Sequence, residues 1–147
     1  MPSPLKTTPA SPSALCPKIL AVDDAKAVRL LAQQAVSGFV CDFSEAANGF
    51  NALFAMERSL PDLILLDVNM PTMGGVEMLT LMRSNPTLKA IPVIMLASRA
   101  DHAVRGQLAT LGVSGVVMKP FTAATLLAAI RGVLELKPTQ PASPHPG

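Results

Sequence analysis

The chain has no tryptophan, no tyrosine and no long hydrophobic run. Its longest apolar runs are the length of one strand and are interrupted by Pro, Asp or Gly, whereas a helix that crosses a membrane needs about 20 apolar residues. Residues 1–17 hold five prolines among serines and threonines and lack the continuous apolar core of a secretory signal. These absences exclude a membrane partner and predict a soluble, cytoplasmic protein.

Clustered basic charge and metal-binding cysteine pairs are also missing. The formal net charge is +2, which falls short of the basic face that non-specific nucleic-acid binding requires, so nucleic acid is not an expected partner. The cysteines, Cys16 and Cys41, lack zinc-site spacing, and we expect free thiols in a reducing compartment. No glycine-rich phosphate loop of the P-loop kind occurs in the chain.

The residues that are present predict one α/β domain. Between residues 18 and 137, short apolar runs alternate five times with stretches of helical periodicity, which is the pattern of repeated βα units. The proline-rich segments 1–17 and 138–147 are expected to be disordered tails. Strands are predicted near residues 18–22, 40–45, 62–66, 92–97 and 114–118, and helices near 25–37, 48–58, 74–84, 100–111 and 122–135.

Charged side chains follow three of the predicted strands. Asp23 and Asp24 follow the first, Asp67 the third and Lys119 the fifth. Because parallel strands share one edge at their carboxyl ends, these side chains are expected to lie together. Clustered carboxylates repel one another unless a cation joins them, and Mg²⁺ prefers oxygen ligands. We therefore predict a magnesium site formed by the three carboxylates and the backbone carbonyl of Asn69.

This arrangement predicts phosphoryl chemistry at Asp67. A carboxylate can attack phosphorus and form an acyl phosphate, and the Lys119 ammonium can pair with the phosphoryl oxygens. A cis peptide bond before Pro120 would aim the lysine inward. Each feature alone has an ordinary explanation, such as a helix cap or a surface lysine. Their coincidence at three strand ends favours a site.

Four segments together resemble the receiver domain of two-component response regulators, most of all the single-domain chemotaxis type. The resemblance covers residues 18–136 and implies a flavodoxin-like fold with five parallel strands in the order 2-1-3-4-5 and five helices. The segments are Ile-Leu-Ala-Val-Asp-Asp at 19–24, Pro-Asp-Leu-Ile-Leu-Leu-Asp-Val-Asn-Met-Pro at 61–71, Pro-Val-Ile-Met-Leu at 92–96 and Lys-Pro-Phe at 119–121.

The resemblance also implies a function. A sensor histidine kinase or phosphotransfer protein would donate a phosphoryl group to Asp67, and the domain would catalyse both this transfer and its own slow dephosphorylation. Asp24 and Asp67 would bind Mg²⁺ directly, and Asp23 through water. A stand-alone receiver of this kind would signal by contact between a downstream target and the face made by the fourth helix, fifth strand and fifth helix.

Two positions depart from the receiver pattern. Ala97 stands where receivers carry a Thr or Ser that contacts the phosphoryl group, and Val116 stands where they carry an aromatic switch residue. Ser98 matches the residue whose backbone N–H faces the phosphate. Adjacent strand residues point to opposite faces, so only a twist or bulge would redirect the Ser98 hydroxyl. We hypothesise an atypical switch at Ala97, Ser98 and Val116.

Two alternatives stay open at this point. The chain can be a pseudo-receiver that acts as a scaffold or binding module without phosphate, or a phosphate sink that signals to nothing. The presence of Asp67, Asp24 and Lys119 weighs against the first alternative. The missing hydroxyl at Ala97 keeps the second one open.

Overall fold

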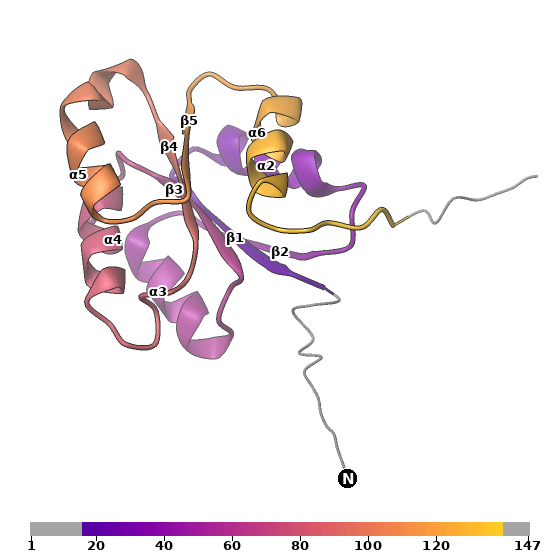
Figure 1. Ribbon diagram of the computed structural model, residues 1–147, viewed down its shortest axis with the longest axis horizontal. Coiled ribbons are helices and arrows are strands. Elements are labelled where there is room, and N and C mark those ends of the chain that lie inside the picture. Colours follow the sequence, from indigo (N-terminus) through magenta and orange to yellow (C-terminus); the bar gives the residue numbers. More distant parts are fainter. Residues whose placement is uncertain (1–15, 140–147) are drawn as a thin grey trace, which may run out of the picture.

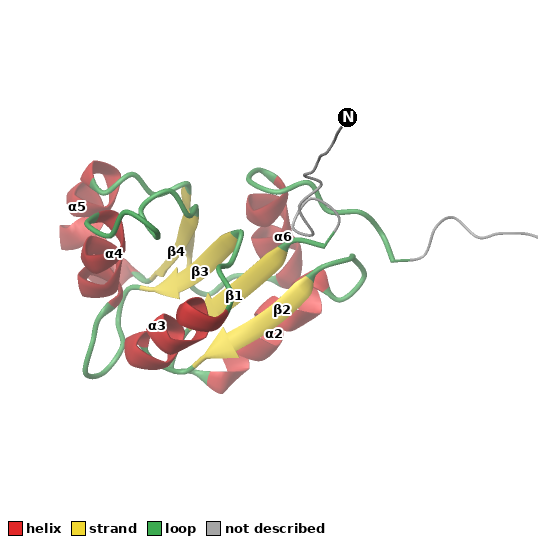
Figure 2. Cartoon of the chain, turned by 90° about the horizontal axis from the view of Figure 1, so that it is seen from below, coloured by secondary structure: helices red, strands yellow, loops and turns green. Residues whose placement is uncertain are grey.

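A computed structural model describes residues 16–139, so the predicted tails lie outside the described residues except for 16–17 and 138–139. Its centre is one sheet of five parallel strands in the order β2-β1-β3-β4-β5, which confirms the predicted order. Figure 2 shows neighbouring strands of the sheet lying side by side. The strands are β1 (Lys18–Val22), β2 (Asp42–Ala46), β3 (Leu63–Asp67), β4 (Val93–Ala97) and β5 (Gly115–Met118).

Helices cover both faces of the sheet (Figure 1). Two helices that contact each other lie on one face, and three lie on the other. The first face has α2 (Lys26–Val36) and α6 (Ala123–Arg131), and the second has α3 (Gly49–Arg58), α4 (Gly75–Arg83) and α5 (Arg105–Thr110), which the 3-10 helix η2 (Arg99–Val104) precedes.

Burial of the strands explains their composition. Every residue of β3 and of β4 is buried, because helices pack against both faces of these inner strands. Successive residues serve opposite faces, so Leu20 packs in one core and Ile19 in the other. The alternating strand β2 lies at an edge and has exposed residues, as its sequence predicts.

Two predicted helices differ from the observed ones. The helix expected over 100–111 is a 3-10 helix as far as Val104 and becomes α-helical only at Arg105. The helix expected over 122–135 ends at Arg131, with Gly132 as its C-cap. Apolar residues after this point keep a helical spacing but belong to a returning segment, in which the Lys137 carbonyl accepts a hydrogen bond from the Val40 N–H.

The returning segment continues past the predicted end of the domain at residue 137. Leu136 is buried in the core that α2 and α6 cover. Pro138 forms an antiparallel bridge with Phe39, and the Thr139 N–H donates to the Gly38 carbonyl. Ordered contacts therefore extend at least through residue 139.

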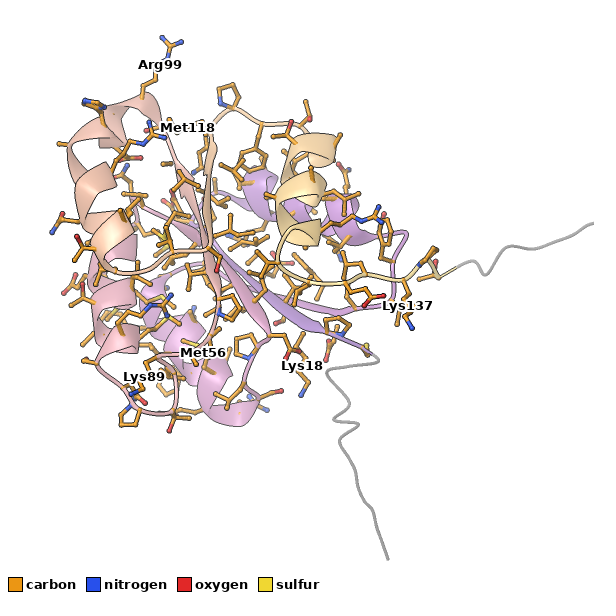
Figure 3. All side chains as sticks on the ribbon, in the orientation of Figure 1. Lys18, Met56, Lys89, Arg99, Met118 and Lys137 are labelled. Atoms are coloured by element: carbon orange, nitrogen blue, oxygen red, sulfur yellow. The ribbon has the colours of Figure 1, made fainter. Side chains whose placement is uncertain are left out.

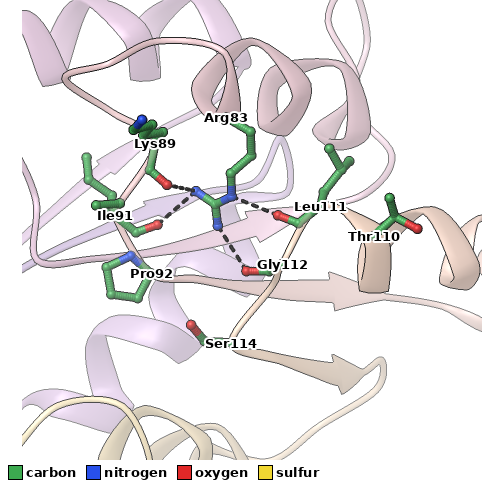
Figure 4. Close-up of a pocket in the computed structure, with 9 residues that line it drawn as sticks. Arg83, Lys89, Ile91, Pro92, Thr110, Leu111, Gly112 and Ser114 are labelled. Carbon is green, nitrogen blue, oxygen red and sulfur yellow. Dashed lines mark hydrogen bonds between the residues drawn. The ribbon is translucent and has the colours of Figure 1, made fainter.

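Arg83 joins three segments at the amino-terminal edge of the sheet. Its guanidinium donates hydrogen bonds to the carbonyls of Lys89, Ile91, Leu111 and Gly112, at 3.1, 3.0, 2.8 and 3.3 Å (Figure 4). These carbonyls belong to the connections that precede β4 and β5. Figure 3 shows that Lys89 lies at the end of the molecule opposite Met118, the last residue of β5.

Replacing Arg83 with alanine should lower the free energy of unfolding by about 3 kcal/mol, because hydrogen bonds from a charged group contribute about 1.5–3 kcal/mol each and water replaces some of them. Lysine at this position should recover little of the lost stability, since an ammonium lacks the planar array of N–H donors of a guanidinium. Urea unfolding followed by far-UV circular dichroism measures the free energies of unfolding of Arg83→Ala and Arg83→Lys. The exposed Arg58, in the last turn of α3, is the matched control. Equal losses of stability in Arg83→Ala and Arg58→Ala would show that the hydrogen bonds of Arg83 do not stabilise the fold.

Candidate functional site

Three of the predicted site residues meet at the carboxyl edge of the sheet. Asp23 follows β1, Asp67 ends β3 and Lys119 follows β5. The Lys119 Nζ lies 2.9 Å from Asp23 Oδ2 and 3.0 Å from Asp67 Oδ1. The structure also has the cis peptide bond between Lys119 and Pro120 that the sequence suggested. One ammonium group therefore bridges two buried carboxylates.

The Asp67 carboxylate is buried among charges of both signs. The residue is 3% exposed, and its burial is the largest influence on the pKa. Burial and the nearby Asp23 carboxylate raise the pKa, while hydrogen bonds from Lys119 and Asn69 lower it. The outcome is a pKa of about 6. The anionic form of Asp67 is thus held at a cost in folding free energy.

This pKa predicts how stability varies with pH. A folded-state pKa near 6, against 3.8 for the ordinary carboxyl, means that protonated Asp67 favours folding below pH 4 and that this stabilisation is lost as the pH rises through 6. Asp67→Asn has no such titration. Allowing for solvent screening at the sheet edge, the variant should gain about 1–2 kcal/mol relative to wild type between pH 4 and pH 7.

Urea unfolding of both proteins at pH 4, 5, 6 and 7, without divalent cations, measures this difference. Other carboxyl groups titrate in both proteins and cancel in the comparison. A difference that stays constant from pH 4 to pH 7 would show that the Asp67 pKa is ordinary.

The acidic residues fit a hard divalent cation. Asp23, Asp24 and Asp67 each offer a carboxylate oxygen, and these oxygens all lie within 4.8 Å of one another. The Ala25 N–H donates to Asp23 Oδ1 at 2.8 Å. Asp23 Oδ2 is buried and accepts no hydrogen bond from the described residues, although the Lys119 ammonium forms an ion pair with it at 2.9 Å. A buried carboxylate oxygen without a hydrogen bond, next to two further carboxylates, suits Mg²⁺.

Asn69 connects the site to an acid that the sequence analysis missed. The Asn69 N–H donates to Asp67 Oδ1 at 3.3 Å, and its side-chain Nδ2 donates to Asp101 Oδ1. Asp101 is 6% exposed, and its Oδ2 accepts from the N–H of Ser98 at 2.7 Å. The spacing of Ser98 and Asp101 is that of a helix capping box, and this pattern was the available signal.

The three switch positions differ in what they contact. Ala97 is buried in the core beneath α3, α4 and α5, and Val116 is half-buried against the same core. The Ser98 hydroxyl lies 3.1 Å from Asp101 Oδ2 and donates to it. The hydroxyl next to Ala97 is therefore engaged by Asp101 in this structure.

Comparison with known proteins agrees with this fold. The family model for the response regulator receiver domain matches residues 19–131. The chain is 32% identical over 114 residues to protein PilG of Pseudomonas aeruginosa, covering 78% of this chain and 84% of PilG. It is 37% identical over 111 residues to chemotaxis protein CheY-3 of Vibrio cholerae, covering 74% and 85%. The solved structure of Vibrio cholerae CheY4 superimposes with a TM-score of 0.74 at 31% identity, covering 81% and 99%.

The parallel sheet and its acidic carboxyl edge define a signal-receiving α/β domain of the flavodoxin-like type. The chain belongs to the response regulator receiver family of two-component signalling and is of the chemotaxis-like type. Within residues 16–139, no helix combines the length and hydrophobicity that crossing a membrane requires. Neither Cys16 nor Cys41 is in a disulfide in this part of the chain.

Proposed function

We propose that Asp67 accepts a phosphoryl group from a sensor histidine kinase or phosphotransfer protein in a Mg²⁺-dependent reaction. The carrying observation is the buried Asp67 carboxylate, which has the Lys119 ammonium 3.0 Å from its Oδ1. A nucleophile beside a fixed cation is the arrangement that phosphoryl transfer requires. With a pKa of about 6, Asp67 is mostly ionised at neutral pH and available for attack.

The geometry indicates which oxygen attacks. Both hydrogen bonds that the described residues donate to the Asp67 carboxylate end on Oδ1, one from Lys119 and one from Asn69. Oδ2 is then the oxygen that forms the new bond to phosphorus. The bond from phosphorus to the donor nitrogen breaks, and its electron pair stays with the donor imidazole. The Lys119 ammonium pairs with the phosphoryl oxygens as they arrive.

The metal ligands follow from the same cluster. Asp24, Asp67 and the backbone carbonyl of Asn69 would hold Mg²⁺ directly, and Asp23 would act through water. Bound there, Mg²⁺ offsets the charge of the carboxylates and of the incoming phosphoryl oxygens. The same residues would support the domain's own dephosphorylation, so that the protein would return to the unphosphorylated state without a separate phosphatase.

Signalling would take place through protein–protein contact in the cytoplasm, at the face made by η2 with α5, β5 and α6. The switch on this face is atypical, because Ala97 offers no hydroxyl and Val116 no ring. A stiff β-branched side chain changes rotamer less readily than a ring. Nucleic acid and membranes are not among the proposed partners. The second candidates are a phosphate-independent scaffold, against which Asp67, Asp24 and Lys119 weigh, and a phosphate sink, which the missing hydroxyl at Ala97 keeps open.

Intact mass after incubation with Mg²⁺ and acetyl phosphate tests the proposal. Wild type should gain one phosphoryl group and Asp67→Ala none. Asp62→Ala is the matched control, since Asp62 precedes the same strand at its opposite end and bonds the Lys18 N–H at 2.8 Å; it should be phosphorylated as wild type is. No uptake by folded wild type would instead support the phosphate-independent scaffold.

A further inference from the structure

Asp101 joins two loops that meet at the phosphorylation site. The register pairs Asp67 with Leu96 and Ala97 with Met118. Continued past the strand ends, these registers place Ser98 between Asn69 and Lys119. Ser98 is the one-residue loop between β4 and η2, and Asn69 lies in the loop after β3.

A single buried carboxylate holds both loops. Asp101 Oδ2 accepts from the Ser98 N–H at 2.7 Å and from the Ser98 hydroxyl at 3.1 Å, and its Oδ1 accepts from the Asn69 side chain. The Asn69 N–H in turn donates to Asp67 Oδ1. Asn69 therefore links the Asp101 carboxylate to the phosphoacceptor through one residue. Asp101 is neither the proposed phosphoacceptor nor a proposed metal ligand.

Asp101 carries a negative charge at neutral pH. Its two oxygens accept three hydrogen bonds, from the Ser98 N–H, the Ser98 hydroxyl and the Asn69 side chain, and such donors favour the ionised carboxylate. The position next to the site is thus occupied by an anion before any phosphoryl group arrives.

We propose that Asp101 is a positioning residue that restrains phosphoryl uptake: it holds the Ser98 amide and the Asn69 side chain in the unphosphorylated protein and releases them when Asp67 is phosphorylated. This proposal rests on the proposed function of Asp67. Asp101, which is not among the predicted metal ligands, opposes the reaction.

Charge and hydrogen bonding supply the reason. A phosphoryl group on Asp67 places negative oxygens close to donors that the Asp101 carboxylate already occupies. The negative phosphoryl oxygens and the Asp101 carboxylate repel each other in a partly buried site. An N–H bonded to one anion is also a poorer donor to a second one, so uptake and the hold of Asp101 oppose each other.

Release of Asp101 would act on the output face. Asp101 lies in the first turn of η2 and closes its capping box with Ser98. Loss of a helix cap is destabilising, and η2 is a 3-10 segment of only six residues. Phosphorylation would loosen η2 and the start of α5 through this route, without a hydroxyl at Ala97 or a ring at Val116.

The rate of phosphoryl uptake by Asp101→Asn tests the proposal. With Mg²⁺ and acetyl phosphate, intact mass against time should show uptake about tenfold faster than in wild type. Glu77→Gln is the matched control, because Glu77 is an exposed acid in the first turn of α4; its rate should equal that of wild type. If Asp101→Asn does not fold, Asp101→Ser carries the same expectation, since its hydroxyl can accept the Ser98 N–H.

The outcomes separate this proposal from the one on which it rests. A merely structural Asp101 would lower the melting temperature without accelerating uptake, so an unchanged or slower rate in a phosphorylatable protein overturns the restraint. Uptake by Asp101→Asn with none by wild type would support it in its strongest form. No uptake by either folded protein would overturn the proposed function, and the restraint with it.

Discussion

Replacing Gly75 with alanine should destabilise the protein by about 4 kcal/mol or more and abolish phosphoryl uptake. A Cβ at this position would lie 2.0 Å from the Asp67 carbonyl oxygen, 2.9 Å from the Asp67 carbonyl carbon and 3.0 Å from the Val68 Cα. All three are backbone atoms, so no side chain can rotate away. The Gly75 N–H also donates to the Val68 carbonyl at 2.9 Å. Relief of the clash requires α4 to move away from β3, the strand that carries Asp67.

Gly74→Ala is the matched control for this prediction. A Cβ at Gly74 meets only the Val68 carbonyl oxygen, at the ordinary contact distance of 3.5 Å. Its cost should stay within about 1 kcal/mol. Far-UV circular dichroism in urea gives both free energies, because the chain has no tryptophan for fluorescence. Two variants of equal stability would show that the approach of α4 to Asp67 is not tight.

Replacing Lys119 with methionine should change phosphoryl uptake and Mg²⁺ binding in opposite directions. The ammonium competes with a metal cation, since it lies 2.9 Å from Asp23 Oδ2 and 3.0 Å from Asp67 Oδ1. Its removal should tighten Mg²⁺ binding by about tenfold or more through loss of charge repulsion. Uptake from acetyl phosphate should fall by about 100-fold, because the phosphoryl oxygens lose a fixed cationic partner.

Calorimetric titration with Mg²⁺ and the time course of intact mass measure the two effects. Lys89→Met is the control, since the Lys89 side chain is exposed and lies at the opposite end of the molecule (Figure 3). A purely structural lysine would weaken both metal binding and uptake when removed. Parallel losses in Lys119→Met would therefore contradict both the competition and the phosphoryl contact.

Local pattern sufficed for most of the architecture. The continuous apolar runs of β3 and β4 predict strands buried on both faces, and the alternation of β2 predicts an edge strand. Threonine before a helix and glycine after one are residue types that favour helix ends. Thr122 caps α6 by accepting from the Thr125 N–H, and Gly112 has a φ of +71° after α5. Such signals depend on neighbours in the chain, so a sequence displays them directly.

Other features depended on contacts between distant segments. The apolar residues after Arg131 keep a helical spacing, yet they lie in a returning segment whose Pro138 pairs with Phe39. The Arg83 guanidinium binds carbonyls up to 29 residues away. No local pattern encodes such partners, because they are set by which chain segments the sheet brings together.

The sequence by itself determined where the charged residues of the candidate site lie: an acid or lysine at the end of each of three apolar strands, which parallel pairing brings to one edge. The tertiary structure alone decided how they interact. It places the Lys119 ammonium between Asp23 and Asp67, leaves a buried Asp23 oxygen without a hydrogen bond, and brings Asp101 to Asn69 across 32 residues of chain. The pattern of apolar strands determines which edge of the sheet a residue occupies. The distances between side chains, their burial and their electrostatic surroundings depend on all the segments that meet at that edge.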